Sequence, residues 1–137
     1  MATADFEASR RPRPLSPHLS IYRPIITMVM SIMHRMTGIM NIAGLVLVVG
    51  YVTALALGPE MFALANAIYG SWIGRIILVA FTWSLFHHMF GGIRHAVWDA
   101  GRGFGDVRYK MSWATLGGSL AATAILWVLV VVVEAFK

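Results

Sequence analysis

The stretch LVLVVGYVTALAL, residues 45–57, decides the fold class of this chain. It contains no charged residue and no polar face at helical spacing, and ILWVLVVVV at 125–133 has the same character. A helix on the surface of a soluble bundle keeps one polar face, so both segments disfavour a soluble α-helical bundle. We interpret them as parts of helices that contact lipid.

The composition of the whole chain supports this interpretation. Of the 137 residues, 58% are hydrophobic and 12% are charged, whereas soluble domains are about 25% charged. Three stretches of 23, 18 and 23 residues contain no Lys, Arg, Asp or Glu: 36–58, 76–93 and 111–133. A helix needs about 20 apolar residues to cross a membrane. The sequence therefore predicts an all-α membrane protein with three transmembrane helices, at about 25–57, 67–98 and 112–135.

The chain divides into an N-terminal arm, residues 1–24, and a three-helix transmembrane domain, residues 25–137. RPRPLSP at 11–17 cannot form a regular helix, because each proline removes a backbone donor and restricts its predecessor. The first residues contain Asp5 and Glu7 and no apolar segment, which is typical of neither a signal peptide nor a transit peptide. We expect the first transmembrane helix to direct insertion.

The positive charges are distributed unevenly, and this predicts the topology. The net charge is +5, and nine of the eleven basic residues flank the start of the first predicted helix or the connection between the second and third. By the positive-inside rule, the N-terminus is cytoplasmic and the C-terminus lies across the membrane. Membrane topology thus explains the excess of basic residues, and binding to nucleic acid is not needed to account for it. The absence of cysteine excludes disulfides and iron–sulfur ligation by this chain.

The segment HHMFGGIRH, residues 87–95, places ionisable side chains in the second apolar helix. Such groups are functional candidates by default, because burying them in a membrane is costly. His88 and His95 are seven residues apart and share a helix face, with the glycines at 91–92 forming a notch beside His88. Counting back from the helix end near residue 98 places His88 roughly 15 Å deep. His87 points about 100° away, and we expect it to face lipid or another subunit.

A neutral imidazole at this depth suits an axial ligand to haem iron, and a histidine hydrogen-bonded within a helix interface is the alternative. Polar groups nearer the boundary could pair with the haem propionates: His34, Arg35, Arg94 and His95. Two positions on one helix cannot lie on opposite faces of one haem. The second ligand must therefore come from His34 or from another chain, and the shallower predicted depth of His34 favours another chain.

The segment SIMHRMTG, residues 31–38, provides a second candidate site. Ser31 and Arg35 share a helix face, since they are four residues apart, and Asp99 is expected near them. A hydroxyl and a guanidinium at the membrane edge could hydrogen-bond the carbonyl of a quinone head group. The alternative is that Arg35 only extends towards lipid phosphate.

Three segments, RPLSPHLSIY (13–22), SIMHRMTG (31–38) and HHMFGGIRHAVWD (87–99), resemble the cytochrome b subunits of succinate dehydrogenase in order and spacing. The resemblance covers nearly the whole chain. It implies a haem b-binding and ubiquinone-binding membrane anchor in a four-subunit respiratory complex. Its partners would be a flavoprotein, an iron–sulfur protein and a second membrane anchor, which packs with this chain into a helical bundle surrounded by lipid.

The resemblance also implies roles for individual residues. His88 matches the axial haem ligand and so contacts the iron, and the other ligand comes from the second anchor. The region of the haem propionates matches His34, Arg35 and His95. Ser31, Arg35 and Asp99 match the ubiquinone pocket.

The resemblance further implies that this non-flavin subunit does not itself oxidise succinate, so we assign it no catalytic residue. We expect it as a multi-pass protein of a bacterial inner membrane, rather than of the mitochondrial inner membrane. A fumarate reductase anchor and a membrane anchor without a redox role are the alternatives, because the sequence does not set the direction of electron flow.

Overall fold

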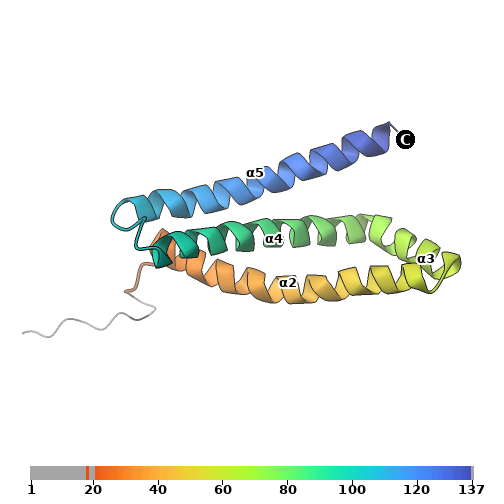
Figure 1. Cartoon of the computed structure of the whole chain (residues 1–137), viewed down its shortest axis with the longest axis horizontal. Coiled ribbons are helices and arrows are strands. Elements are labelled where there is room, and N and C mark those ends of the chain that lie inside the picture. The colour runs from red at the N-terminus through yellow and green to blue at the C-terminus, as the bar shows by residue number, and fades with distance from the viewer. Residues whose placement is uncertain (1–17, 19–20, 137) are drawn as a thin grey trace, which may run out of the picture.

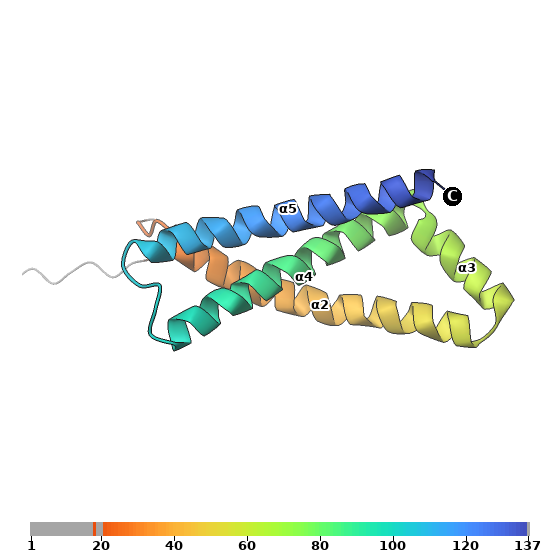
Figure 2. The same ribbon diagram turned by 45° about the horizontal axis from the view of Figure 1, so that its top comes forward.

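The computed structural model describes residue 18 and residues 21–136, which form four helices. These are α2 (Ile26–Ala56), α3 (Pro59–Gly70), α4 (Trp72–Asp99) and α5 (Val107–Ala135). The long helices α2, α4 and α5 run alongside one another, and α3 crosses the end where α2 finishes and α4 begins (Figures 1 and 2). We call that end the distal end. The opposite end, where α2 and α5 begin and α4 ends, is the histidine end. Most of the expected arm 1–24 lies outside the described residues.

The three long helices have 31, 28 and 29 residues, and each is long and apolar enough to cross a membrane. At 1.5 Å per residue, each exceeds the roughly 30 Å of a hydrocarbon core, so each has room to tilt. The predicted all-α class with three transmembrane helices is confirmed.

The helix bounds differ from the expected ones at two connections. The helix expected at 67–98 is divided at Ser71, whose extended backbone ends α3 and whose hydroxyl accepts a hydrogen bond from the Gly74 amide at 3.1 Å. This is an N-cap, and it starts a new helix. Before α3, Gly58 has a φ of +112° and Pro59 occupies the first helical turn. The last helix begins at Val107, five residues before the expected start.

The interior of the described chain is mainly polar. Among residues 18 and 21–136, only three hydrophobic residues are buried: Met30, Ala54 and Ala65. In the same part of the chain, eight polar residues are buried: Thr37, Ser84, His87, Arg94, Ser112, Thr115, Ser119 and Thr123. Most large hydrophobic side chains point outward along all three long helices. In lipid this distribution is stable, because apolar surface gains nothing by leaving the hydrocarbon, while polar groups must find partners inside.

The central helix α4 packs against both α2 and α5. At the interface with α2, Gly44 leaves room for the ring of Phe81, because a Cβ at Gly44 would lie 1.9 Å from that ring. Ser84 donates hydrogen bonds across the same interface to the Thr37 carbonyl and the Asn41 amide oxygen, at 3.0 and 2.8 Å. These contacts fix the rotation of α4 that places the histidines.

Candidate cofactor site

A row of aromatic rings joins α2 to α4 at the histidine end. The rings of His34 and His88 stack with their centroids 4.0 Å apart and their planes 7° from parallel. The ring of His95 also lies near that of His34, with centroids 5.0 Å apart and planes tilted by 53°. Trp98 meets His95 edge-on at 5.3 Å. The structure thus brings together His34, His88 and His95, three residues that the sequence analysis singled out.

Two glycines allow the histidines to lie this close to the opposite helix. A Cβ at Gly91 would be 2.5 Å from Nδ1 of His34, and one at Gly38 would be 3.2 Å from Cε1 of His88. Gly92 differs, because no atom lies within 4 Å of a Cβ placed there. The two glycines of the predicted notch therefore differ. The ring of His34 packs against Gly91, whereas Gly92 faces open space within this chain.

The hydrogen bonds of His88 fix the orientation of its ring. Nδ1 lies 3.0 Å from the carbonyl oxygen of His34 and 3.3 Å from Oγ1 of Thr37. The Thr37 hydroxyl donates to the same carbonyl at 2.9 Å. Because a carbonyl only accepts, we assign the proton of a neutral His88 to Nδ1. The lone pair is then on Nε2, the arrangement in which an imidazole binds a metal.

The stack also changes the argument about the second axial ligand. Helical counting placed His34 at a shallower depth than His88, but the centroids of the two rings are only 4.0 Å apart, so depth alone does not decide whether His34 can be the second ligand. His34 is unsuited for a different reason. Two rings stacked face to face lie on the same side of any haem bound to His88, so they cannot bind iron from opposite faces. Among the described residues, no group of three or more histidine or acidic side chains is arranged to hold a metal ion.

The neighbouring His87 corrects another expectation. It is fully buried between α4 and α5 rather than facing lipid or another subunit. Its Nδ1 lies 3.2 Å from Oγ of Ser119, and its ring is 5.2 Å from that of Trp83. A ligand outside the chain therefore cannot reach His87 without separating these helices.

Arg94 is likewise inside the chain, only 2% exposed, and not at the edge where propionate pairing was considered. Its Nη1 donates to Oγ of Ser112 at 3.3 Å, and its guanidinium lies 5.0 Å from the Trp98 ring. The sequence analysis missed the stripe of α5 hydroxyls that receives His87 and Arg94. Its signal was present: four hydroxyl residues at helical spacing in an apolar helix, namely Ser112, Thr115, Ser119 and Thr123.

The residues considered for quinone binding are not all brought together. Ser31 is half-buried and lines a cavity of about 300 Å³ with Trp98 and Arg108, two residues that the sequence analysis did not assign to it. Arg35 and Asp99 are exposed at the same end and lie outside the wall of this cavity. Within this chain, the three residues considered for quinone binding therefore do not line one common cavity.

Of the donors at this site, one residue is suited to bind a haem iron. His88 offers an oriented imidazole with a free Nε2, and Gly92 leaves adjacent space into which a flat ligand can enter. His34 and His95 supply further ring N–H groups beside it.

Comparison with known proteins identifies similar sequences over most of the chain. Residues 9–133 match the family model described as succinate dehydrogenase/fumarate reductase transmembrane subunit. The succinate dehydrogenase cytochrome b556 subunit of Paracoccus denitrificans is 39% identical over 120 residues, covering 87% of this chain and 92% of the relative. The subunit of the same name from Rickettsia conorii is 36% identical over 117 residues, covering 85% and 91%. The mitochondrial cytochrome b560 subunit of Bos taurus is 38% identical over 105 residues, covering 66% and 55%.

Proposed function

The chain belongs to the succinate dehydrogenase/fumarate reductase transmembrane subunit family, and from this premise we propose that it is the haem b-binding and ubiquinone-binding anchor of a succinate dehydrogenase. The relatives reported above are named as succinate dehydrogenase subunits, which favours this assignment over a fumarate reductase anchor. The complex is an oxidoreductase. This subunit would pass electrons towards quinone in the membrane, while succinate oxidation belongs to the flavoprotein.

The hydrogen bond from Nδ1 of His88 to the His34 carbonyl carries the haem assignment, since it leaves Nε2 free and fixes the plane of the ring. When bound, haem b supplies a one-electron redox centre. His88 and a residue of the second anchor subunit would hold the iron. The propionates would be held by His34, Arg35 and His95, because these residues provide hydrogen-bond donors near His88 at the histidine end.

For ubiquinone we propose Ser31, Arg35 and Asp99, with the partner subunits completing the pocket. Ser31 lines a cavity at the histidine end, and the polar head of an amphipathic ligand would enter there if this end lies at the membrane surface. Arg35 is exposed within this chain, so its guanidinium is free to reach a ligand or a neighbouring subunit. The iron–sulfur protein and the second anchor are the partners that we expect at this end, and we place the complex in a bacterial inner membrane.

The adjacent histidines provide a matched test of the haem site. We would purify the complex with His88→Ala or His87→Ala and record reduced-minus-oxidised absorbance spectra, normalised to the flavin content. We expect His88→Ala to lose the b-type signal and His87→Ala to keep it in whatever complex assembles. An unchanged b-type signal in His88→Ala would exclude His88 as the axial ligand.

A further inference from the structure

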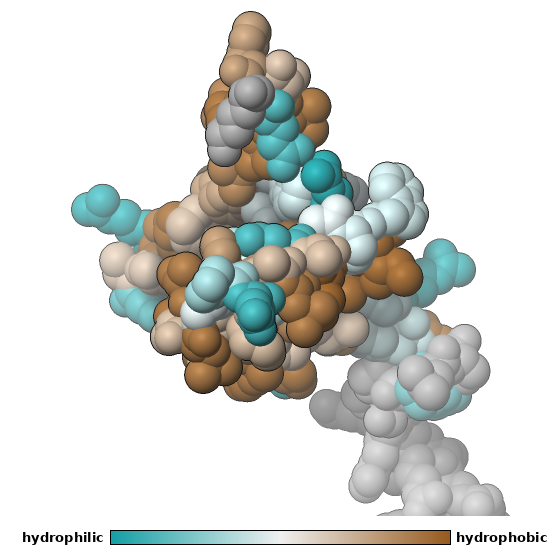
Figure 3. Space-filling model, turned by 90° about the vertical axis from the view of Figure 1, so that its right-hand side faces the viewer, coloured by the Kyte–Doolittle hydropathy of each residue, from teal (hydrophilic) through white to brown (hydrophobic). Residues whose placement is uncertain are grey.

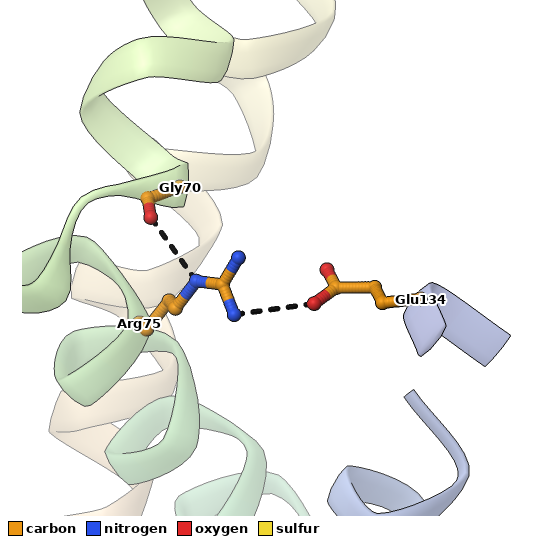
Figure 4. Close-up of polar contacts among 3 residues, drawn as sticks. All are labelled: Gly70, Arg75 and Glu134. Carbon is orange, nitrogen blue, oxygen red and sulfur yellow. Dashed lines mark hydrogen bonds and ion pairs between the residues drawn. The ribbon is translucent and has the colours of Figure 1, made fainter. Parts of the chain in front are cut away.

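A second polar feature lies at the distal end, remote from the histidines. Arg75, in the first turn of α4, contacts Glu134, near the end of α5, with 3.2 Å between Nη1 and Oε2. Its Nε also donates to the carbonyl of Gly70, the last residue of α3, at 3.0 Å. Figure 4 shows the guanidinium between these two partners. The side chains of the pair are 48% and 49% exposed, so a ligand can reach both charges.

The ion pair lies at the edge of a cavity of about 570 Å³ to which all four helices contribute. This volume is within the roughly 300–1,000 Å³ typical of ligand pockets. Its wall is mostly apolar and includes Leu47, Leu78, Phe81, Trp127 and Val130. Viewed from this end, hydrophilic side chains lie among hydrophobic ones on the surface (Figure 3).

The polar and apolar parts of the cavity lie at different depths. Phe81 is six residues beyond Arg75 in α4, and Trp127 is seven residues before Glu134 in α5. At 1.5 Å per residue, both rings lie about 10 Å closer to the middle of the membrane than the charged pair. The cavity thus has charged groups at the membrane surface and an apolar wall facing the hydrocarbon, which matches an amphipathic lipid.

The charges of the pair point to the kind of head group. The ion pair uses Nη1 of Arg75 and Oε2 of Glu134, which leaves Nη2 as a donor and Oε1 as an acceptor. A zwitterion complements this arrangement, because its anion and cation can bind both charges without separating them. We propose that the distal cavity binds a phospholipid with a primary-amine zwitterionic head group. Its phosphate contacts Arg75, its ammonium contacts Glu134, and one acyl chain lies along the apolar wall.

This chemistry predicts a preference among head groups. A primary ammonium donates hydrogen bonds to the Glu134 carboxylate, whereas a trimethylammonium has no N–H group to donate. A phosphoglycerol head group has no cation and leaves its net negative charge near Glu134. The proposal does not depend on the haem or quinone assignments, since the cavity is at the opposite end of the molecule.

Native mass spectrometry of the purified, delipidated complex tests the proposal. To each variant we would add an equimolar mixture of phosphatidylethanolamine, phosphatidylcholine and phosphatidylglycerol with identical acyl chains, and measure how much of each lipid is retained. We expect one tightly retained phosphatidylethanolamine per copy of this chain, bound about tenfold more tightly than the other two lipids, the effect of one lost charge-assisted hydrogen bond. Arg75→Gln should weaken retention of all three phosphate lipids. Glu134→Gln should abolish the preference for phosphatidylethanolamine over phosphatidylglycerol.

The control variant is Glu60→Gln, which removes an exposed acid at the same end, in the first turn of α3 and outside the cavity wall. It should leave the preference unchanged. Because the preference is a ratio measured within one sample, it does not depend on how much of a variant folds. Equal retention of the three lipids, displacement of the bound lipid by ubiquinone, or absence of bound lipid from the assembled complex would each overturn the proposal.

Discussion

Two adjacent histidines have different surroundings because an α-helix turns by about 100° between them. His88 faces α2, where a backbone carbonyl orients its ring, and His87 faces α5, where a hydroxyl does. Both belong to the same polar segment of the sequence. Helical spacing predicts that they diverge, but it cannot tell which side is lipid and which is another helix of the same chain.

Gly91 is the position where a single methyl group should disturb the site. A Cβ there would lie 2.5 Å from Nδ1 of His34, so Gly91→Ala should push that ring away from His88. We expect a loss of about 1–3 kcal/mol in stability, as for overpacking, together with a shifted haem midpoint potential. Thermal unfolding and redox titration of the complex measure these effects. Gly117→Ala is the control, because its Cβ would meet no atom within 4 Å.

Arg35 can be tested separately from the haem ligand. Arg35→Ala should lower ubiquinone reduction by about tenfold or more, the effect of losing a charged hydrogen-bond donor. Succinate oxidation with a soluble artificial acceptor should continue. Arg102→Ala, which removes an exposed charge from the connection at the same end, is the matched control. Loss of both activities in Arg35→Ala would assign Arg35 to assembly instead.

At the scale of elements, α3 depends on contacts outside itself. A helix of 12 residues is marginal on its own, and this one is held to α2 by two hydrogen bonds. Tyr69 donates to the Leu47 carbonyl at 2.6 Å, and Tyr51 donates to Asn66 at 2.8 Å. These are tertiary contacts between positions 15 and 22 residues apart. The sequence therefore showed the break at Gly58-Pro59 but not the helix that follows it.

The turn between α2 and α3 offers a backbone test. Gly58 adopts a φ of +112° and a ψ of 178°, which residues with a Cβ rarely do, so Gly58→Ala should destabilise the folded chain by about 1–3 kcal/mol. Gly70→Ala should have a smaller effect, since Gly70 is helical and its Cβ would meet open space. Thermal unfolding of the two variants in the same membrane mimetic compares them. An equal loss in both would contradict the strain argument.

At the scale of the whole molecule, the sequence predicted the transmembrane helices well and their mutual rotation poorly. Long charge-free stretches define a membrane span regardless of neighbours, which is why three helices were expected and found. Rotation depends instead on which polar residue of one helix meets which residue of another. The polar interface of His87 and Arg94 with α5 and the stack of His34 on His88 are of this kind, and counting along one helix cannot show them.

Topology gives a prediction for the entire chain. The histidine end should be cytoplasmic, because nine of the eleven basic residues are predicted on that side of the membrane. The distal end should then face the opposite side of the membrane. The absence of cysteine allows single-cysteine labelling. In intact cells an impermeant maleimide should modify Glu60→Cys, whereas Phe104→Cys should react only in inverted membrane vesicles. The reverse pattern would show the opposite orientation.

The polar interior has a consequence for how the chain responds to temperature. The apolar faces of the helices stay in hydrocarbon whether the helices are packed or apart, so their separation exposes little apolar surface to water. The heat-capacity change of that separation is then small, since this change in soluble proteins comes mainly from hydrating apolar groups. Stability should therefore vary almost linearly with temperature instead of passing through a maximum. The helices should stay together in the cold, where soluble proteins lose hydrophobic stabilisation.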